Sequence, residues 1–143
     1  MSNLLKEPKH RAIIALDFDK NIADSHYPAI HKLFDNAKEV VNFFYDENIY
    51  IIINTCRNGK EMEQARQFLI QEGVKFDKIN EQHPYVIQLF GNDTRKISAD
   101  FYVDDKDLYA QFNPLWPNWL DIKSKVMTII NSKNFTSILH YKL

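Results

Sequence analysis

At 143 residues, with 45% apolar and 13% aromatic side chains, the chain has the composition of one globular domain and not of a disordered segment. Its formal net charge of −1 provides no overall attraction to nucleic acid or to an anionic membrane surface. The longest apolar runs have about five residues, far fewer than the roughly 20 that span a bilayer, and the single cysteine, Cys56, cannot form an internal disulfide. We therefore expect one cytoplasmic domain over residues 1–143, without a membrane partner.

The first half of the chain predicts a strand, a polar segment, a helix and a second strand. Residues 1–10 form a polar lead-in that lacks the apolar stretch of a secretory signal. The apolar run 12–16 is typical of a strand covered on both faces, and an irregular polar stretch follows over about 18–35. A helical stripe of apolar residues predicts a helix over about 36–46, and the β-branched residues of 48–54 indicate the second strand.

The second half continues this alternation. Apolar residues at helical spacing predict a helix over 59–73, and shorter strands are expected over 74–80 and 99–105. A last helix is expected over about 119–131, and residues 132–143 are expected to be an edge strand or a docked tail. Strands that alternate with helices predict an α/β domain with a mostly parallel sheet.

Polar side chains follow three of the predicted strands. Asp17 and Asp19 follow the first strand, Thr55 follows the second, and Asp104 and Asp105 end the last. In parallel sheets ligands gather beyond the carboxyl ends of the strands, so we expect these groups to converge. Converging carboxylate and carbonyl oxygens suit a hard cation such as Mg²⁺. A carboxylate that faces a phosphoryl group can also act as a nucleophile and form an aspartyl-phosphate.

Phosphoryl chemistry also needs an acid for the leaving oxygen, and donors or cations for the phosphoryl charge. Asp19 lies at the same strand end as Asp17 and can be the acid. Thr55 offers a hydroxyl group, and Lys96, just before the last strand, offers an ammonium group. Each required group therefore has a candidate in the sequence.

These residues resemble the motifs of the haloacid dehalogenase (HAD) superfamily. "LDFDKNIAD" is similar to the first motif, an apolar strand followed by Asp-x-Asp-Gly-Thr, and "IIINTCR" is similar to the second, a Thr or Ser after an apolar strand. "TRKISADFYVDD" resembles the third and fourth, a Lys followed by an apolar strand that ends in acids. The motifs occur in the family's order, and the resemblance covers about residues 11–131. It extends to small bacterial members that carry segments similar to "CRNG", "FDKIN" and "RKISAD".

The resemblance implies a three-layer, Rossmann-like HAD fold and a Mg²⁺-dependent phosphatase. It implies Asp17 as the nucleophile and Asp19 as the general acid/base, and an acid at this second position favours hydrolysis over a long-lived phosphoenzyme. The metal would be held by Asp17, Asp104 and the backbone carbonyl of Asp19, with Asp105 nearby. The groups that would position and neutralise the phosphoryl group are Thr55 and Lys96.

The sequence departs from the family pattern directly after Asp19. Asn21 replaces the usual Thr and can make similar turn hydrogen bonds. Lys20 replaces the usual Gly, and it either aids an anionic substrate or weakens the turn. Arg57 is either a cation that faces the substrate or a helix-capping surface residue, so the candidate substrate contacts are Lys20, Asn21 and Arg57. Cys56 is interpreted as a structural thiol, because no base partner is indicated.

No cap domain is expected. The intervals 17–55 and 55–96 are each filled by the helix and strand already assigned to them. A capless member of the superfamily has an open site. The expected partner is a phosphorylated substrate, small or macromolecular, and an open site also suits closure by a second subunit in a homo-oligomer.

Three other kinds of protein share part of this pattern. "DFDKN" mimics part of a calcium loop, but Ile22 and Pro28 stand where that loop needs Gly and Glu. A phosphorelay receiver domain is disfavoured, because its phosphorylated Asp follows a middle strand and its acidic pair follows the first. The rival from another functional class is a catalytically silent HAD-like binding or regulatory module, which Lys20 and the open site would suit.

Overall fold

The computed structural model describes residues 8–142, so most of the polar lead-in lies outside the described residues. Four strands form one sheet in the order β5-β4-β1-β6, and every neighbouring pair is parallel. These strands are β1 (Ala12–Leu16), β4 (Ile49–Ile53), β5 (Lys78–Ile79) and β6 (Phe101–Val103). The predicted α/β architecture with a mostly parallel sheet is confirmed.

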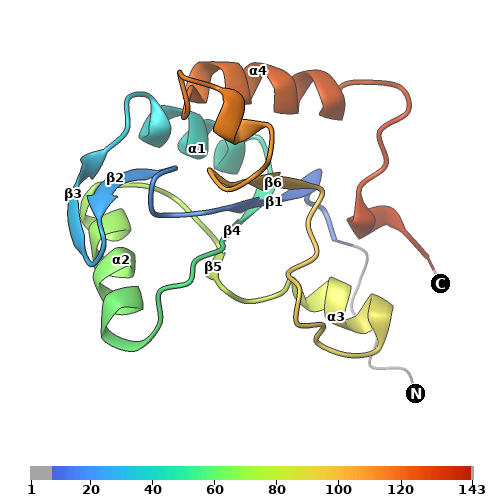
Figure 1. Ribbon diagram of the computed structural model, residues 1–143. Helices are drawn as coiled ribbons and strands as arrows, with labels where there is room; N and C mark the ends of the chain where they lie inside the picture. The colour runs from blue at the N-terminus through green and yellow to red at the C-terminus, as the bar shows by residue number, and fades with distance from the viewer. Residues whose placement is uncertain (1–7, 143) are drawn as a thin grey trace.

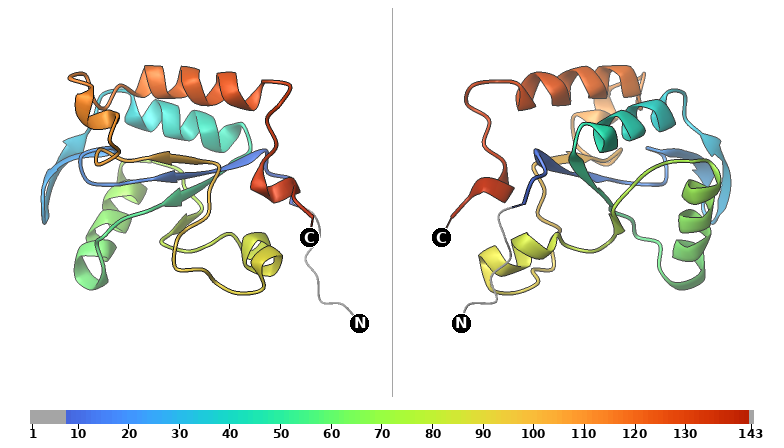
Figure 2. Two further views of the ribbon diagram at one scale, coloured as in Figure 1. Left: turned by 45° about the vertical axis from the view of Figure 1, so that its right-hand side comes forward. Right: turned by 180° about the vertical axis from the view of Figure 1, so that it is seen from behind.

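Helices cover both faces of this sheet, which makes three layers (Figures 1 and 2). One face carries α1 (Ala37–Asp46) and α4 (Trp119–Ile130). The other carries α2 (Gly59–Gln71) and the short α3 (Pro84–Phe90). The predicted helices over 36–46, 59–73 and 119–131 are confirmed within one or two residues at their ends.

The central strand β1 shows why its sequence is apolar at every position. Ala12, Ile14 and Leu16 belong to the main core cluster, together with residues of α1 and α4. Ile13 points to a second cluster that includes residues of α3. Because both faces of β1 are buried, an alternating polar pattern is absent, as expected for a covered parallel strand. Burial of each large aliphatic side chain contributes about 1.5–3 kcal/mol.

A hairpin and a helix were not predicted from the sequence. The stretch expected to be irregular over 18–35 contains the antiparallel strands β2 (Ala23–His26) and β3 (Ala29–Leu33). Helix α3 has only seven residues, too few to show a clear helical period, and is bounded by Pro84 at its start and Gly91 at its end. Strand β5 is shorter than the predicted strand over 74–80.

The hairpin and α3 mark opposite ends of the sheet. The β2–β3 hairpin lies beyond the carboxyl ends of the parallel strands, whereas α3 and the segment after it lie toward their amino ends (Figures 1 and 2). Any residue that precedes a parallel strand therefore lies far from the residues that follow it.

The C-terminal segment is a docked tail, one of the two expected alternatives. It contains a 3-10 turn, η2 (Ile138–His140), whose Leu139 is fully buried in the second core cluster. The carboxylate of Asp100 accepts hydrogen bonds from the hydroxyl of Ser137 (2.7 Å) and from the backbone N–H groups of Ile138 (2.9 Å) and Ile13 (2.8 Å). One carboxylate thus joins the tail to the central strand.

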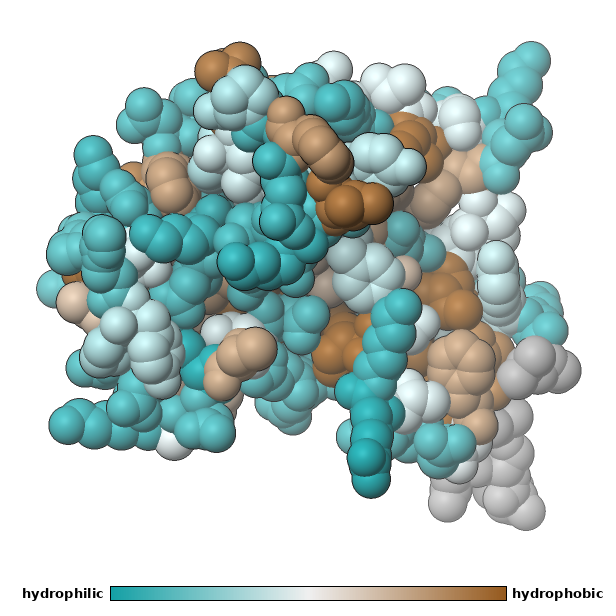
Figure 3. Space-filling view, in the orientation of Figure 1, coloured by the Kyte–Doolittle hydropathy of each residue, from teal (hydrophilic) through white to brown (hydrophobic). Residues whose placement is uncertain are grey.

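The connection from β6 to α4 carries exposed apolar side chains. It includes a 3-10 turn, η1 (Ala110–Phe112), and the exposed large side chains there are Leu108, Tyr109, Phe112 and Leu115. In the orientation of Figure 1, apolar side chains interrupt the hydrophilic surface near the top of the molecule (Figure 3). Within residues 8–142, none of the helices has the length and apolar character required to cross a membrane.

Candidate functional site

Three carboxylates from two neighbouring strands meet at the carboxyl edge of the sheet. Asp17 follows β1, and Asp104 and Asp105 follow β6, which pairs with β1. The backbone N–H of Asp17 donates to the carbonyl of Val103 (2.9 Å) and so continues the strand pairing to this point. One oxygen from each of the three carboxylates lies within 4.8 Å of the others. The structure therefore brings Asp17, Asp104 and Asp105 together, as the sequence predicted.

The pKa of the Asp17 carboxyl is raised in this cluster of acids. Its burial, followed by the negative charge of Asp104 and by a hydrogen bond and charge from Asp105, raises the pKa of the Asp17 carboxyl to about 8. The N–H of Phe18, which donates to its Oδ1 (2.9 Å), opposes this shift. The repulsion among the acids is relieved either by a proton on Asp17 or by a cation.

Asn21 connects this group to the segment before α4. Its side-chain nitrogen donates to Oδ2 of Asp17 (2.9 Å), to the carbonyl of Asp19 (2.9 Å) and to Oδ1 of Asp105 (3.1 Å). Its side-chain oxygen accepts from the indole N–H of Trp116 (3.0 Å). Because an indole nitrogen only donates, the amide oxygen of Asn21 must face Trp116 and its NH₂ group must face the acids. The buried amide therefore lies among the oxygens that would hold a cation.

Asp19 forms an ion pair with Arg57. The guanidinium donates to both carboxylate oxygens, from Nε to Oδ2 (2.8 Å) and from Nη2 to Oδ1 (2.7 Å). The hydroxyl of Ser25, in the β2–β3 hairpin, also donates to Oδ1 (2.6 Å). Burial alone would raise the pKa of Asp19, but the hydrogen bonds from Arg57 and Ser25 outweigh it and lower this pKa. In the free protein Asp19 is thus an ionised carboxylate with a hydrogen bond to each oxygen.

Arg57 is enclosed rather than open to solvent. Its side chain is 0% exposed and lies between the rings of Phe18 (5.3 Å from the guanidinium carbon to the ring centre) and Tyr27 (4.9 Å). Of the two alternatives for Arg57, the surface cap is therefore wrong, because the side chain is buried and its donors face Asp19. The neighbouring Cys56 is exposed, so it is not the buried structural thiol that was expected.

Thr55 lies at the same edge of the sheet, on the side of β4. It exchanges two hydrogen bonds with Asn80, which follows β5: the N–H of Thr55 donates to Oδ1 of Asn80 (2.8 Å), and Nδ2 of Asn80 donates to the carbonyl of Thr55 (2.8 Å). The hydroxyl oxygen of Thr55 accepts from the N–H of Arg57 (3.1 Å). Thr55 is thus fixed between two neighbouring strand ends.

The structure does not bring Lys96 to this group, which corrects the placement expected from the sequence. Lys96 precedes β6, and because β6 runs parallel to β1, it lies toward the amino ends of the strands. Its ammonium lies over the ring of Tyr102, 5.1 Å from the ring centre, and its backbone carbonyl accepts from Gln82 (3.0 Å). The expected convergence on Asp17 overlooked that only residues after a parallel strand share its carboxyl edge.

Lys20 adopts the backbone conformation that glycine favours. Its φ of 68° lies in the left-handed region, and its N–H donates to the carbonyl of Ala23 (2.9 Å) at the start of the hairpin. The turn therefore forms with lysine in place of the glycine that the resembling motif carries. The Lys20 side chain is exposed.

Sequence reasoning missed three side chains that support this site. Asn80 follows a parallel strand, and the rule that identified Thr55 would also have identified it. Trp116 lies far along the chain from Asn21, and Ser25 lies in a polar stretch, so neither had a local signal. These contacts depend on how the elements are arranged in space.

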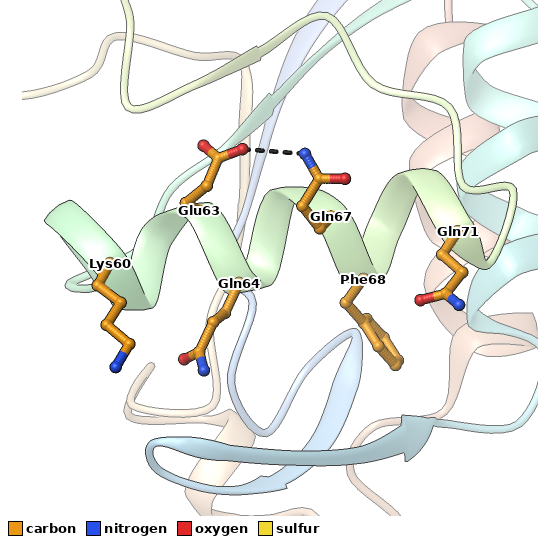
Figure 4. Close-up of a pocket in the computed structure, with 6 residues that line it drawn as sticks. All are labelled: Lys60, Glu63, Gln64, Gln67, Phe68 and Gln71. Atoms are coloured by element: carbon orange, nitrogen blue, oxygen red, sulfur yellow. Dashed lines mark hydrogen bonds between the residues drawn. The ribbon is translucent and has the colours of Figure 1, made fainter.

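Among the hollows of the described residues, one runs along α2 and another has an acid of the cluster in its wall. The larger, of about 520 Å³, runs along α2, where Lys60, Gln64, Phe68 and Gln71 point to one side while Glu63 and Gln67 bond to each other on the other (Figure 4). None of the three clustered acids lines it. The smaller, of about 270 Å³, includes Asp104 in its wall. The wall residues besides Asp104 are Tyr102, Asp107, Tyr109, Ala110, Asn113, Trp116, Asp121, Ile122 and Lys125.

Comparisons with known proteins show the architecture and no activity. No protein-family model matches the chain, and no curated protein matches it. Among solved structures, a conserved protein of Bacteroides thetaiotaomicron is similar, with a TM-score of 0.70 and 26% sequence identity. The similarity covers 82% of this chain and 90% of that chain. It is a likeness in three-dimensional structure over most of both chains.

Proposed function

We propose that this chain is a capless, Mg²⁺-dependent phosphohydrolase of the HAD-like type that acts through an aspartyl-phosphate. The observation that carries the proposal is the meeting of Asp17, Asp104 and Asp105 within 4.8 Å at the carboxyl edge of the sheet. Asp19 and Thr55 lie at the same edge, on the two central strands. The order of the motifs along the chain supports the same assignment.

The donor set fits a hard divalent cation. Asp17, Asp104 and Asp105 offer clustered carboxylate oxygens, and all are ligands of the kind that Mg²⁺ prefers. The NH₂ group of Asn21 bonds to two of these carboxylates, Asp17 and Asp105, and to the backbone carbonyl of Asp19, which is a further oxygen ligand. The pKa of Asp17 is raised by burial and by the negative charges of Asp104 and Asp105, and a cation here would favour the ionised carboxylate against both. When bound, Mg²⁺ would offset negative charge on the phosphoryl oxygens of the substrate.

The reaction can be written with this chain's own groups. A carboxylate oxygen of Asp17 attacks phosphorus, the P–O ester bond breaks, and the leaving oxygen takes a proton from solvent, or from Asp19 after Asp19 has itself taken up a proton. A water molecule then attacks the acyl phosphate, Asp19 takes a proton from that water, and the products are phosphate and free Asp17. Because the ion pair with Arg57 keeps Asp19 ionised, the second half-reaction suits its state in the free protein.

The first experiment is hydrolysis of p-nitrophenyl phosphate, whose leaving group departs without protonation. We expect release that requires Mg²⁺ in the wild type, disappears in Asp17→Asn and is unchanged in Asp93→Asn, an exposed acid that lies before β6 and not after it. Calorimetric titration with Mg²⁺ runs beside it. Absence of both turnover and Mg²⁺ binding would contradict the proposal.

Two observations favour a second candidate function, a catalytically silent HAD-like binding or regulatory module. Both oxygens of Asp19 are engaged by Arg57, and Lys96 is not at the site. Wild-type protein that binds Mg²⁺ but releases no p-nitrophenol would favour this second function.

A further inference from the structure

Arg57 is a buried cation at the candidate site, and its neighbours determine which groups its guanidinium can contact. Its residue is 1% exposed, the ring of Phe18 lies against one side of the guanidinium and the ring of Tyr27 lies near it. Its Nη1 reaches the carbonyl of Glu61 in α2 (3.4 Å). A guanidinium enclosed in this way is not open to a substrate, and its two shortest contacts are to the oxygens of Asp19.

The ion pair between Asp19 and Arg57 joins segments of the chain that are far apart in sequence. Asp19 lies after β1, and Arg57 lies between β4 and α2. The hairpin reaches the same carboxylate through Ser25, which is fully buried, and reaches the guanidinium through the ring of Tyr27. A bidentate guanidinium–carboxylate pair fixes both the position and the plane of the carboxylate, which a single hydrogen bond does not.

We propose that Arg57 is a positioning residue that acts through Asp19: it fixes the plane of the Asp19 carboxylate at the carboxyl edge of the sheet and holds the β2–β3 hairpin against the site. Neither function is part of the roles assigned above to Asp17, Asp19, Thr55 and the acids of β6. The catalytic half of the inference rests on the proposed phosphohydrolase function. The hairpin half does not depend on catalysis.

A double-mutant cycle between Arg57→Gln and Asp19→Asn tests the catalytic half. With p-nitrophenyl phosphate and Mg²⁺, we expect Arg57→Gln to lower kcat about 100-fold while KM changes by less than about threefold. In the Asp19→Asn background, the same change should lower kcat by less than about threefold, because the group that Arg57 positions is already lost. Arg57→Lys, which keeps the charge and one hydrogen bond, should recover part of the loss.

Arg66→Gln is the matched control. Arg66 is an arginine of α2 that pairs with Glu63 on the helix surface, so its removal should leave kcat and KM unchanged. A kcat loss that is as large in the Asp19→Asn background as in the wild type would overturn the proposal. A rise in KM at constant kcat would also overturn it, because it would show that Arg57 contacts the substrate.

Hydrogen exchange tests the hairpin half and needs no turnover. We expect amides of residues 23–33 to exchange at least about tenfold faster in Arg57→Gln than in the wild type, and amides of β4 to be unchanged. Ser25→Ala is a milder change that removes only the hydroxyl that donates to Asp19, and it should speed the exchange of the same amides. This variant also tests the proposal if Arg57→Gln does not fold. Unchanged hairpin exchange in both variants would refute this half, whether or not the wild type hydrolyses a phosphoester.

Discussion

The indole nitrogen of Trp116 donates a hydrogen bond of 3.0 Å to Oδ1 of Asn21, 95 positions away in the chain. This contact sets the orientation of an amide that is 0% exposed and whose NH₂ group faces Asp17 and Asp105. The backbone carbonyl of Asn21 is held in turn by the indole of Trp119 (2.8 Å). The segment that leads into α4 thus fixes Asn21, and Asn21 in turn bonds to two of the clustered acids.

We predict that Trp116→Phe destabilises the protein and changes its affinity for Mg²⁺. The change leaves Oδ1 of Asn21 without its donor in a buried place, which should lower the free energy of unfolding by about 1–3 kcal/mol. The freed amide can also turn its oxygen toward the acids, so Mg²⁺ affinity should change. Urea unfolding and calorimetry measure the two effects. Leu115→Ala, an exposed neighbour, should shift stability by less than about 0.5 kcal/mol, and a Trp116→Phe protein as stable as this control would contradict the prediction.

Lys96→Ala is predicted to leave catalysis nearly unchanged. The ammonium lies against Tyr102 toward the amino ends of the strands, whereas the acids lie beyond the carboxyl ends. We expect kcat/KM for p-nitrophenyl phosphate to stay within about threefold of the wild type, a loss of less than about 0.7 kcal/mol in transition-state stabilisation. Asp17→Asn serves as the inactive reference. A loss of about 100-fold in Lys96→Ala would show that this lysine reaches the phosphoryl group during turnover.

The architecture was predictable because it depends on local patterns that the parallel sheet requires. Strand β1 is buried on both faces, so its apolar run of five residues was sufficient to identify it. The rule that ligands gather beyond strand ends then placed Asp17 beside Asp104 and Asp105. Lys96 was chosen for its ammonium group and by the family resemblance, without this rule, and its position before β6 places it toward the other end of the sheet.

What could not be predicted depends on contacts between distant segments. Strand β2 has the sequence "ADSH", in which one buried position is Ala23 of the core and the other is Ser25 at the polar site, so it lacks a clear apolar alternation. The pairing of Arg57 with Asp19 required that Phe18 and Tyr27 enclose the guanidinium, and the sequence alone left Arg57 open between substrate contact and surface cap. Short elements whose residues serve a site lack the periodicity that core-facing elements have.

Mg²⁺ binding is predicted to strengthen as the pH rises toward 8. The pKa of Asp17, raised to about 8 by burial and by Asp104, exceeds its ordinary value of 3.8, so between these values the folded protein holds a proton that the unfolded chain does not. The metal-free protein should therefore lose stability from this group as the pH rises, and a cation must displace the proton at lower pH. Thermal unfolding with and without Mg²⁺ should show a larger stabilisation at pH 8 than at pH 6. In Asp17→Asn this difference should vanish; a stabilisation in the wild type that does not vary with pH would contradict the assignment.

His83 is predicted to make the protein sensitive to acid. Burial, and then the charge of His10, lower the pKa of His83 from 6.5 to about 4, and its Nδ1 accepts from the N–H of Tyr85 (3.0 Å) at the start of α3. Between pH 6.5 and 4 the unfolded chain binds a proton that the folded protein does not, so stability falls as the pH falls, by up to about 3 kcal/mol. His83→Asn keeps a helix-capping acceptor without titrating. The stability difference between wild type and His83→Asn should shift in favour of the variant as the pH falls from 7 to 4.5, and a constant difference would contradict the prediction.

Asp100→Asn is predicted to release the C-terminal tail from the sheet. In the wild type Oδ2 accepts from Ile13 and Ser137 and Oδ1 accepts from Ile138, so all three donors meet a carboxylate. An amide places its NH₂ group against at least one of these donors, which leaves buried polar groups unpaired and should cost about 2–4 kcal/mol of unfolding free energy. Asp93→Asn is the exposed control. Because the tail should detach before the sheet unfolds, amides of 137–140 should lose their exchange protection in Asp100→Asn under native conditions. Protection equal to the wild type in those amides would mean that burial of Leu139 alone holds the tail.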